Sequence, residues 1–132
     1  MKTTTTKQER LEAVNELIKV IATCGRRFFS ETSDNKPFIS YMEIDERGRI
    51  WFIDSWTKKP VYTHYHGEWR HFSNGGTLRR LVESFKNHII KGTQLNAGYF
   101  EPVINDYLTD IWGYGEDILI VKEAAIRLGI AA

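Results

Sequence analysis

The chain is predicted to fold as a single α+β domain, with an N-terminal helix, a four-stranded antiparallel sheet and two C-terminal helices. Three patterns predict this class: a helical stripe of apolar residues near the N-terminus, four aromatic and β-branched segments separated by short turns, and two later apolar helical segments. A length of 132 residues suffices for one hydrophobic core, and neither a repeat nor a linker divides it. We therefore expect residues 1–132 to form one domain.

The first helix is predicted after a threonine-rich start, because residues 1–7 carry no hydrophobic pattern and are expected to fray. Its apolar residues recur at helical spacing, and they are Leu11, Val14, Leu17, Ile18 and Ile21. Gly25 is expected to end the helix. Cys24, in its last turn, is interpreted as a small buried thiol, since no catalytic motif lies close to it.

Four strands are predicted next, at residues 26–30, 38–44, 49–54 and 61–65. Turn residues separate them, and such short connections make successive strands antiparallel. In the third strand Ile50 and Phe52 share one face, while Trp51 and Ile53 point the opposite way. Because both faces carry apolar side chains, we expect helices to cover one face and loops or a partner to cover the other.

The second helix has apolar residues at helical spacing and a glycine stop, namely Leu78, Leu81, Val82, Phe85, Ile89 and Gly92. The last helix is predicted from Glu116 to Leu128 and is apolar most of the way round. Acidic Glu116 and Asp117 suit a helix start. Such a helix is either deeply buried or in contact with another subunit, so a homo-oligomer through residues 116–128 is one expectation.

The composition excludes several classes of protein. A hydrophobic fraction of 42% with 27% charged residues is typical of a folded soluble protein and not of a disordered one. No apolar run approaches the roughly 20 residues that span a membrane. No signal peptide is recognised, and the single cysteine cannot form an internal disulfide. We expect a cytoplasmic protein.

The net charge is only +1, which argues against a nucleic-acid clamp over the whole surface. Charge is uneven along the chain, however. Residues 57–91 hold seven lysines and arginines against two glutamates, whereas residues 92–132 hold two basic residues against six acidic ones. We interpret these poles as neighbours that neutralise each other in the fold; the alternative is two separate binding faces.

The start of the second helix is a candidate anion-binding surface. Gly75 and Gly76 allow a close approach of the backbone, and Thr77 can cap the helix. Exposed N–H groups together with Arg79 and Arg80 could hold a phosphate. The alternative is an ordinary turn with solvated arginines, since no Gly-Lys-Ser/Thr sequence of a P-loop is present.

Aromatic rings next to basic residues form a second candidate surface. The rings are Trp56, Tyr62, Tyr65 and Trp69, and the cations are Lys58, Lys59 and Arg70. This mixture stacks bases and holds the phosphate backbone in single-strand-binding proteins, although strand aromatics are more often buried. The predicted binding face joins Lys58, Lys59, Trp69 and Arg70 to the helix start at Gly75, Gly76, Thr77, Arg79 and Arg80.

A metal-dependent enzyme is the weaker alternative. His64 and His66 would share one face of a strand, and His71 is close enough in sequence to join them, with Asp54 or Glu68 as a carboxylate. No His-Glu-x-x-His or Cys-x-x-Cys motif supports this site, and histidines are common at the polar edge of a sheet. We therefore expect neither a bound metal nor a cofactor.

Four segments carry a resemblance to known proteins: Gly48 to Asp54, Val61 to Tyr65, Trp69 to Val82, and the Ile-Trp-Gly-Tyr-Gly-Glu-Asp sequence that begins at Ile111. On these segments the chain resembles small uncharacterised proteins of phages, prophages and plasmids. The resemblance implies an accessory protein that binds a host or foreign macromolecule, and it implies no reaction. We therefore predict a non-catalytic binding module. A protein partner is favoured slightly over nucleic acid, because the net charge is small.

Overall fold

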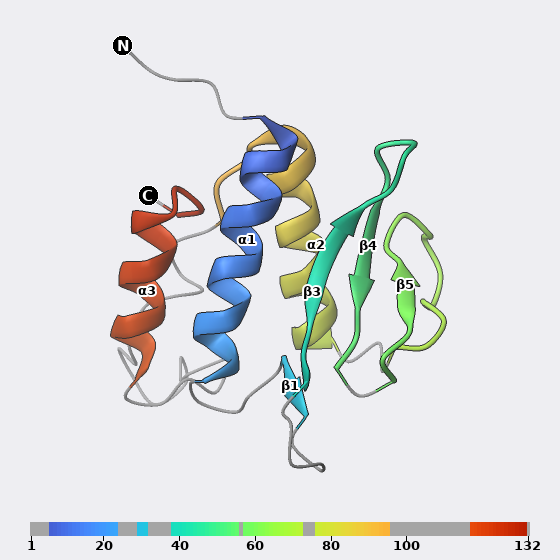
Figure 1. Ribbon diagram of the computed structural model, residues 1–132, viewed down its shortest axis with the longest axis horizontal. Helices are drawn as coiled ribbons and strands as arrows, with labels where there is room; N and C mark the ends of the chain where they lie inside the picture. Colours follow the sequence, from blue (N-terminus) through green and yellow to red (C-terminus); the bar gives the residue numbers. More distant parts are fainter. Residues whose placement is uncertain are drawn as a thin grey trace.

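The computed structural model describes residues 6–23, 29–31, 38–55, 57–72, 76–95 and 117–131, and this part of the chain forms three helices beside a small antiparallel sheet (Figure 1). The predicted α+β class, with one helix before the sheet and two after it, is confirmed. Helix α1 lies at the centre of the helical layer, where it contacts α2, α3 and the strands β2 and β3.

Helix α1 spans Lys7–Ala22 and begins with a capping box that the sequence analysis missed. The backbone N–H of Thr6 donates to Glu9 Oε1 at 2.9 Å, and the Glu9 N–H donates to Thr6 Oγ1 at 3.1 Å. Thr6 and Lys7, which we expected to fray, thus form the capped start of the helix. The predicted apolar stripe is confirmed, since all five of its residues are buried. Cys24 and Gly25 lie outside the described residues.

The strands are β1 Ser30–Glu31, β2 Phe38–Ile39, β3 Tyr41–Ile44, β4 Ile50–Ile53 and β5 Pro60–Tyr62. Strand β1 pairs antiparallel with β2, and β3, β4 and β5 form an antiparallel three-stranded sheet in that order. The strand predicted at 38–44 is interrupted at Ser40, whose N–H donates to the Phe29 carbonyl at 2.8 Å and whose Oγ accepts from the Ser55 N–H at 2.8 Å. Each of the four predicted segments thus contains a strand, although residues 26–28 of the first lie outside the described residues. The strands form a two-stranded and a three-stranded sheet in place of the single four-stranded sheet that we predicted.

The two faces of the three-stranded sheet differ as the alternation predicted. Met42, Phe52 and Val61 are paired across the three strands, and all three are buried in the core. On the opposite face, cross-strand pairing forms two rows, Tyr41–Ile53–Pro60 and Glu43–Trp51–Tyr62. We call this second face the open face, because the core residues and the helices lie on the other side of the sheet.

Helix α2 spans Gly76–Lys91 and turns an apolar side toward the core. Its predicted stripe is confirmed, with Leu81, Val82, Phe85 and Ile89 all fully buried. Gly92 ends the helix as predicted, at a φ of +75°, and its N–H donates to the His88 carbonyl at 2.8 Å.

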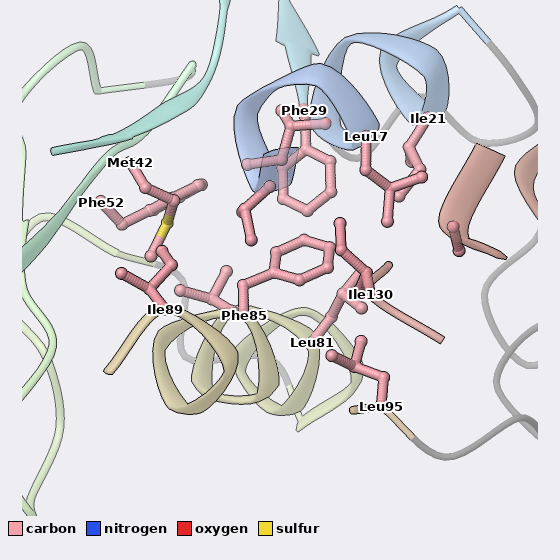
Figure 2. Packing of buried hydrophobic residues seen from close by; sticks show 14 of the residues in the cluster. Leu17, Ile21, Phe29, Met42, Phe52, Leu81, Phe85, Ile89, Leu95 and Ile130 are labelled. Atoms are coloured by element: carbon pink, nitrogen blue, oxygen red, sulfur yellow. The ribbon is translucent and has the colours of Figure 1, made fainter. Parts of the chain in front are cut away.

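The core lies between α1, α2 and the sheet (Figure 2). Phe29 is at its centre, with ring centroids 5.9 Å from Phe52 of the sheet and 6.1 Å from Phe85 of α2. Edge-to-face and tilted packing of this kind is the favoured arrangement of aromatic pairs. The rings therefore join the helical layer to the sheet.

Helix α3 spans Ile118–Arg127 and is buried on one side only. The buried residues are Ile118, Val121, Ala124 and Ala125. The opposite side exposes Leu119, Ile120 and Ile126, which are 60%, 52% and 45% exposed. The helix is thus not buried on all sides. The alternative expectation, that it contacts another subunit, stays a prediction for this exposed side. Across the described ranges, every helix falls short of the length and apolar character needed to cross a lipid bilayer.

Both outer strands of the three-stranded sheet carry a feature that limits further pairing. Next to β3, the amide of Asn15 in α1 accepts from the Met42 N–H at 2.7 Å and donates to the Met42 carbonyl at 3.0 Å. At the other edge, β5 begins with Pro60, which has no N–H to donate. The Asn15 side chain therefore occupies the backbone groups that a neighbouring strand would use.

Candidate binding pocket on the open face of the sheet

A pocket of about 690 Å³ lies against the open face of β4 and β5. It is lined by Trp51, Lys59, Pro60, Tyr62, Tyr65, Glu68, Trp69, Arg70 and His71. Residues of β4 and β5 and the adjoining Lys59 supply part of this lining, and the segment from Tyr65 to His71 supplies the rest. We call this the open-face pocket. Its volume falls within the range of about 300–1,000 Å³ that is typical of ligand-binding pockets.

The strand wall is a pair of rings held in a fixed orientation. Trp51 and Tyr62 are cross-strand partners with centroids 5.0 Å apart. The Trp51 indole N–H donates to Asp45 Oδ2 at 2.9 Å, and the Arg49 guanidinium lies 5.7 Å from the Tyr62 centroid. The hydrogen bond from Trp51, followed by the one from the Arg49 N–H, lowers the pKa of Asp45 and keeps this acceptor charged. A ligand would therefore meet a preformed aromatic surface.

Tyr65 supplies the most accessible ring of the pocket, since its side chain is 61% exposed. Its ring lies over the backbone at Gly67, where a Cβ atom would stand 2.8 Å from Tyr65 Cε2. Only glycine leaves room for the ring in this position. Gly67 thus determines where the Tyr65 ring lies, and the ring has a large area left to bury against a ligand.

Trp69 does not present its ring to solvent, and this expectation from the sequence was wrong. The side chain is 3% exposed and belongs to the hydrophobic core. Its indole N–H donates to the Tyr65 carbonyl at 2.8 Å, and its ring packs 5.3 Å from Phe72. A large ring at the end of a short sheet buries more apolar area inward than outward, and its N–H still finds a partner there. Trp69 therefore forms the floor of the pocket.

Arg79 is held against this floor and is not a solvated cation. Its guanidinium lies 4.3 Å from the Trp69 centroid, and its Nε donates to Glu83 Oε1 at 3.0 Å. Its Nη2 also donates to the Tyr65 carbonyl at 3.4 Å. The side chain is only 19% exposed. Arg79 therefore connects α2 to the Tyr65–Trp69 segment, and its charge is already balanced by Glu83.

Lys59 and Arg70 are the basic side chains that the pocket offers to a ligand. Both residues are exposed, and in the part of the chain that the structure describes neither side chain makes a hydrogen bond or an ion pair. Glu68 lines the same pocket and is also exposed. Lys58 lies beyond this lining, with its Nζ 5.7 Å from the Phe38 centroid. The pocket therefore has two uncommitted positive side chains and one carboxylate.

Two turns beside the pocket hold residues in the left-handed region. Lys58 has a φ of 59° and His71 a φ of 63°. Thr57 Oγ1 donates to the His71 carbonyl at 3.0 Å, so the two turns are joined. For residues other than glycine this conformation is uncommon, and it is found more often near functional sites than elsewhere. The turns set the positions of Lys59 and Arg70, which directly adjoin them.

The candidate anion site at the start of α2 is only partly described. Gly75 lies outside the described residues. The helix begins at Gly76, so Thr77 lies within the first turn and not at the cap position where the sequence placed it. Arg80 is exposed, but Arg79 is engaged with Trp69 and Glu83. The two arginines therefore do not act as a pair.

The structure does not bring the three candidate metal ligands together. His64, His66 and His71 are all described, and no group of three or more His, Cys, Asp or Glu residues in the described ranges is placed to hold a metal ion. His64 Nε2 accepts from the Ile50 N–H at 3.0 Å, which leaves that nitrogen unable to bind a metal. Burial, followed by the charges of Lys86 and Arg49, lowers the pKa of His64. This histidine therefore acts as a neutral hydrogen-bond acceptor.

The sequence analysis did not assign Trp51, Pro60 or Glu68 to the binding face. Trp51 could have been predicted, because the alternation of residues 49–54 places its ring on the face of the sheet away from the core. Nothing in the sequence indicated Glu68, since its position depends on how the loop from Tyr65 to His71 folds back over the sheet. Trp56, one of the rings considered for binding, lies outside the described residues.

Comparisons with known proteins give one consistent result. A family model described as YoqU matches residues 4–130. The chain is 31% identical over 124 residues to a protein of Bacillus subtilis strain 168 named "SPbeta prophage-derived uncharacterized protein YoqU", covering 92% of this chain and 82% of that protein. No solved structure matches the chain. The resemblance to prophage proteins that the sequence indicated is confirmed.

Proposed function

The chain belongs to the YoqU family, and from the lining of the open-face pocket we propose that it is a non-catalytic binding protein that recognises a macromolecular partner there. The proposal places its action in the cytoplasm, where a single cysteine stays reduced. The partner is a host or foreign protein.

One observation carries this proposal: a pocket of about 690 Å³ combines oriented aromatic rings with two basic side chains, Lys59 and Arg70, that have no partner among the described residues. Tyrosine, tryptophan and arginine are the residues enriched in protein interfaces and at their energetically dominant positions. Trp51, Tyr62 and Tyr65 supply the rings, and Arg70 supplies the guanidinium. Rings that are already oriented lose little conformational entropy when a partner binds.

Nucleic acid is the alternative partner, and the geometry favours it less. Binding along a phosphate backbone requires several basic contacts, because each neutralised phosphate contributes through counterion release. Of the predicted basic residues, Arg79 is paired with Glu83, and the pocket itself contains Glu68. Trp69, one of the rings expected to stack on bases, is buried. A pocket closed by loop residues suits an inserted side chain better than a continuous strand of bases.

A metal-dependent enzyme using His64, His66 and His71 is disfavoured, because His64 Nε2 already accepts a backbone N–H.

The test of the proposal compares matched tyrosine variants in the capture of partners from host lysate. Tyr65→Ala removes the accessible ring of the pocket, and Tyr41→Ala removes a ring that is 39% exposed on the same face but lies outside the lining. We expect partner capture to be lost with Tyr65→Ala and with Arg70→Glu, and kept with Tyr41→Ala. The captured protein must then bind the purified wild-type chain directly. Equal capture by all variants would contradict the proposal.

A second copy of the chain is the partner that we propose for α3. Its outward side forms a shallow hollow lined by Leu119, Lys122, Glu123, Ile126 and Arg127. This set is self-complementary, because an antiparallel pair of α3 helices would bury the apolar residues and set Glu123 of one copy near the basic residues of the other. Glu123 already lies 3.7 Å from Arg127 within one copy, so this charge pairing needs only a change of partner.

A further inference from the structure

The chemistry of the open-face pocket identifies a class of ligand more narrowly than a protein partner in general. We infer that the pocket binds an acidic peptide segment that inserts an aromatic side chain between the Trp51–Tyr62 wall and Tyr65. This inference rests on the proposed binding function, and its test is chosen so that the two can fail separately.

The aromatic preference follows from the shape and lining of the pocket. The Trp51 and Tyr62 rings, which pack 5.0 Å apart, line the pocket together with the exposed Tyr65 ring and the buried Trp69 ring. The indole N–H groups of Trp51 and Trp69 already donate hydrogen bonds within the chain, to Asp45 and to the Tyr65 carbonyl respectively. The ring surfaces therefore offer apolar and π contacts, which an aromatic side chain matches best.

The acidic preference follows from the charges that remain uncommitted. Other basic side chains of the sheet and α2 already have partners: Arg79 pairs with Glu83, Arg49 with Asp45, and Lys86 Nζ donates to the Thr63 carbonyl at 2.7 Å. Lys59 and Arg70 have none within the described residues, and both stand at the pocket. A carboxylate on either side of the inserted ring would meet one of these two cations.

Because Glu68 carries the opposite charge to Lys59 and Arg70, substitutions in the pocket can either strengthen or weaken the binding of an acidic ligand. It lines the pocket next to the two cations, so it opposes an acidic ligand while Lys59 and Arg70 attract it. Replacing Glu68 with glutamine should strengthen binding, and replacing Arg70 with glutamine should weaken it. The two substitutions are matched, because both residues are exposed neighbours of Trp69 and each change removes one charge.

The experiment measures fluorescence anisotropy with four labelled probes and the full chain. The probes are a short peptide with one tryptophan flanked by aspartates, the same peptide with alanine in place of tryptophan, the same peptide with lysines in place of the aspartates, and oligothymidylate. We expect the first probe to bind at least about tenfold more tightly than each of the others. Glu68→Gln should tighten its binding several-fold, and Arg70→Gln and Tyr65→Ala should each weaken it about tenfold.

Four results would overturn the inference. Equal binding of the alanine peptide would show that no ring is inserted, and equal binding of the lysine peptide would remove the acidic preference. Tighter binding of oligothymidylate would assign the pocket to nucleic acid. If no peptide binds, the inference fails, yet the proposed function stands as long as partner capture from lysate still requires Tyr65 and Arg70. Partner capture that is insensitive to both residues would instead refute the proposed function itself.

A structural variant separates insertion from a general effect of charge. Gly67→Ala would place a Cβ 2.8 Å from Tyr65 Cε2 and so push the exposed ring out of position without changing any charge. We expect this variant to keep its fold and to lose the preference for tryptophan over alanine in the peptide. Asn87→Ala, on the exposed side of α2, is the control and should leave all four affinities unchanged.

Discussion

Two aromatic residues that are close in sequence, Trp69 and Tyr65, differ sharply in how far their side chains are exposed. Trp69 and Tyr65 are four positions apart and joined by a hydrogen bond of 2.8 Å, yet one is 3% exposed and the other 61% exposed. Burial of the first ring contributes to the free energy of unfolding, whereas the second has surface left for a partner. Substitution of the two residues should therefore affect different measurements.

Trp69→Ala is expected to lower the free energy of unfolding by about 3–5 kcal/mol, because it removes a core ring and uncovers Arg79. Tyr65→Ala should change it by no more than about 0.5 kcal/mol. Urea denaturation followed by circular dichroism measures both. A small loss of stability for Trp69→Ala would mean that the ring is not part of the core.

The neutral state of His64 predicts a dependence of stability on pH. Its ordinary pKa of 6.5 applies to the unfolded chain, and burial lowers the pKa in the folded state. The unfolded chain therefore takes up a proton first as the pH falls. Stability is complete above about pH 6.5 and is lost as the pH falls from there through the lowered folded pKa.

The matched test is His64→Gln, whose amide oxygen can accept the Ile50 N–H without titrating. We expect the free energy of unfolding of the wild type to fall as the pH is lowered from about 6.5 to about 5, and this fall to be smaller in the variant. His88 adds to the fall with the same sign, since burial also lowers its pKa. An unchanged pH dependence in His64→Gln would show that this imidazole is not held neutral.

Those features of the helices and strands that depend on local sequence patterns could be predicted, whereas those that depend on contacts between distant residues could not. The stripes of α1 and α2 and the alternation in β4 follow from local periodicity, and the structure confirms them. The Thr6–Glu9 capping box was readable from its spacing but was hidden by the repetitive threonines. The break at Ser40 depends on hydrogen bonds to Phe29 and Ser55, which are distant in sequence, so no local pattern indicates it.

The end of α2 provides a prediction at the scale of an element. Gly92 adopts a φ of +75°, and Arg10 of α1 donates to the carbonyls of Ile89 at 2.9 Å and Ile90 at 3.3 Å. Gly92→Ala should lower the free energy of unfolding by about 1–2 kcal/mol, because alanine is strained in the left-handed region. Thermal denaturation monitored by circular dichroism measures this change. A neutral effect would contradict the glycine-dependent C-cap.

At the scale of the whole molecule, the sequence predicted the class and the order of the elements, but not which basic and aromatic residues meet. Lys59 and Arg70 of the predicted binding face both line the pocket, and their role in binding stays a prediction. The expectation that Trp69 faces solvent was wrong, because the layers close over that ring. Which aromatic residues are buried depends on loop geometry and on contacts such as that of Arg79 with Trp69. The hydrophobic periodicity of the sequence carries no information about such contacts.

The exposed side of α3 predicts the assembly of the protein. We expect sedimentation at micromolar concentration to give the mass of a dimer, and Ile126→Lys to return it to a monomer by placing a charge in the contact. Asn87→Lys adds the same charge on an exposed position of α2 and should leave the mass unchanged. A wild-type monomer under these conditions would remove the proposed role of α3.

The amide of Asn15 has a further effect on how this protein can meet other chains. By satisfying both backbone groups of Met42, it leaves β3 without a template for an incoming strand, while Pro60 removes a donor from β5. Recognition by sheet extension, in which main-chain bonds supply affinity for almost any sequence, is thereby disfavoured. These edges of the three-stranded sheet thus favour contacts through side chains over main-chain pairing, and they disfavour polymerisation of the sheet.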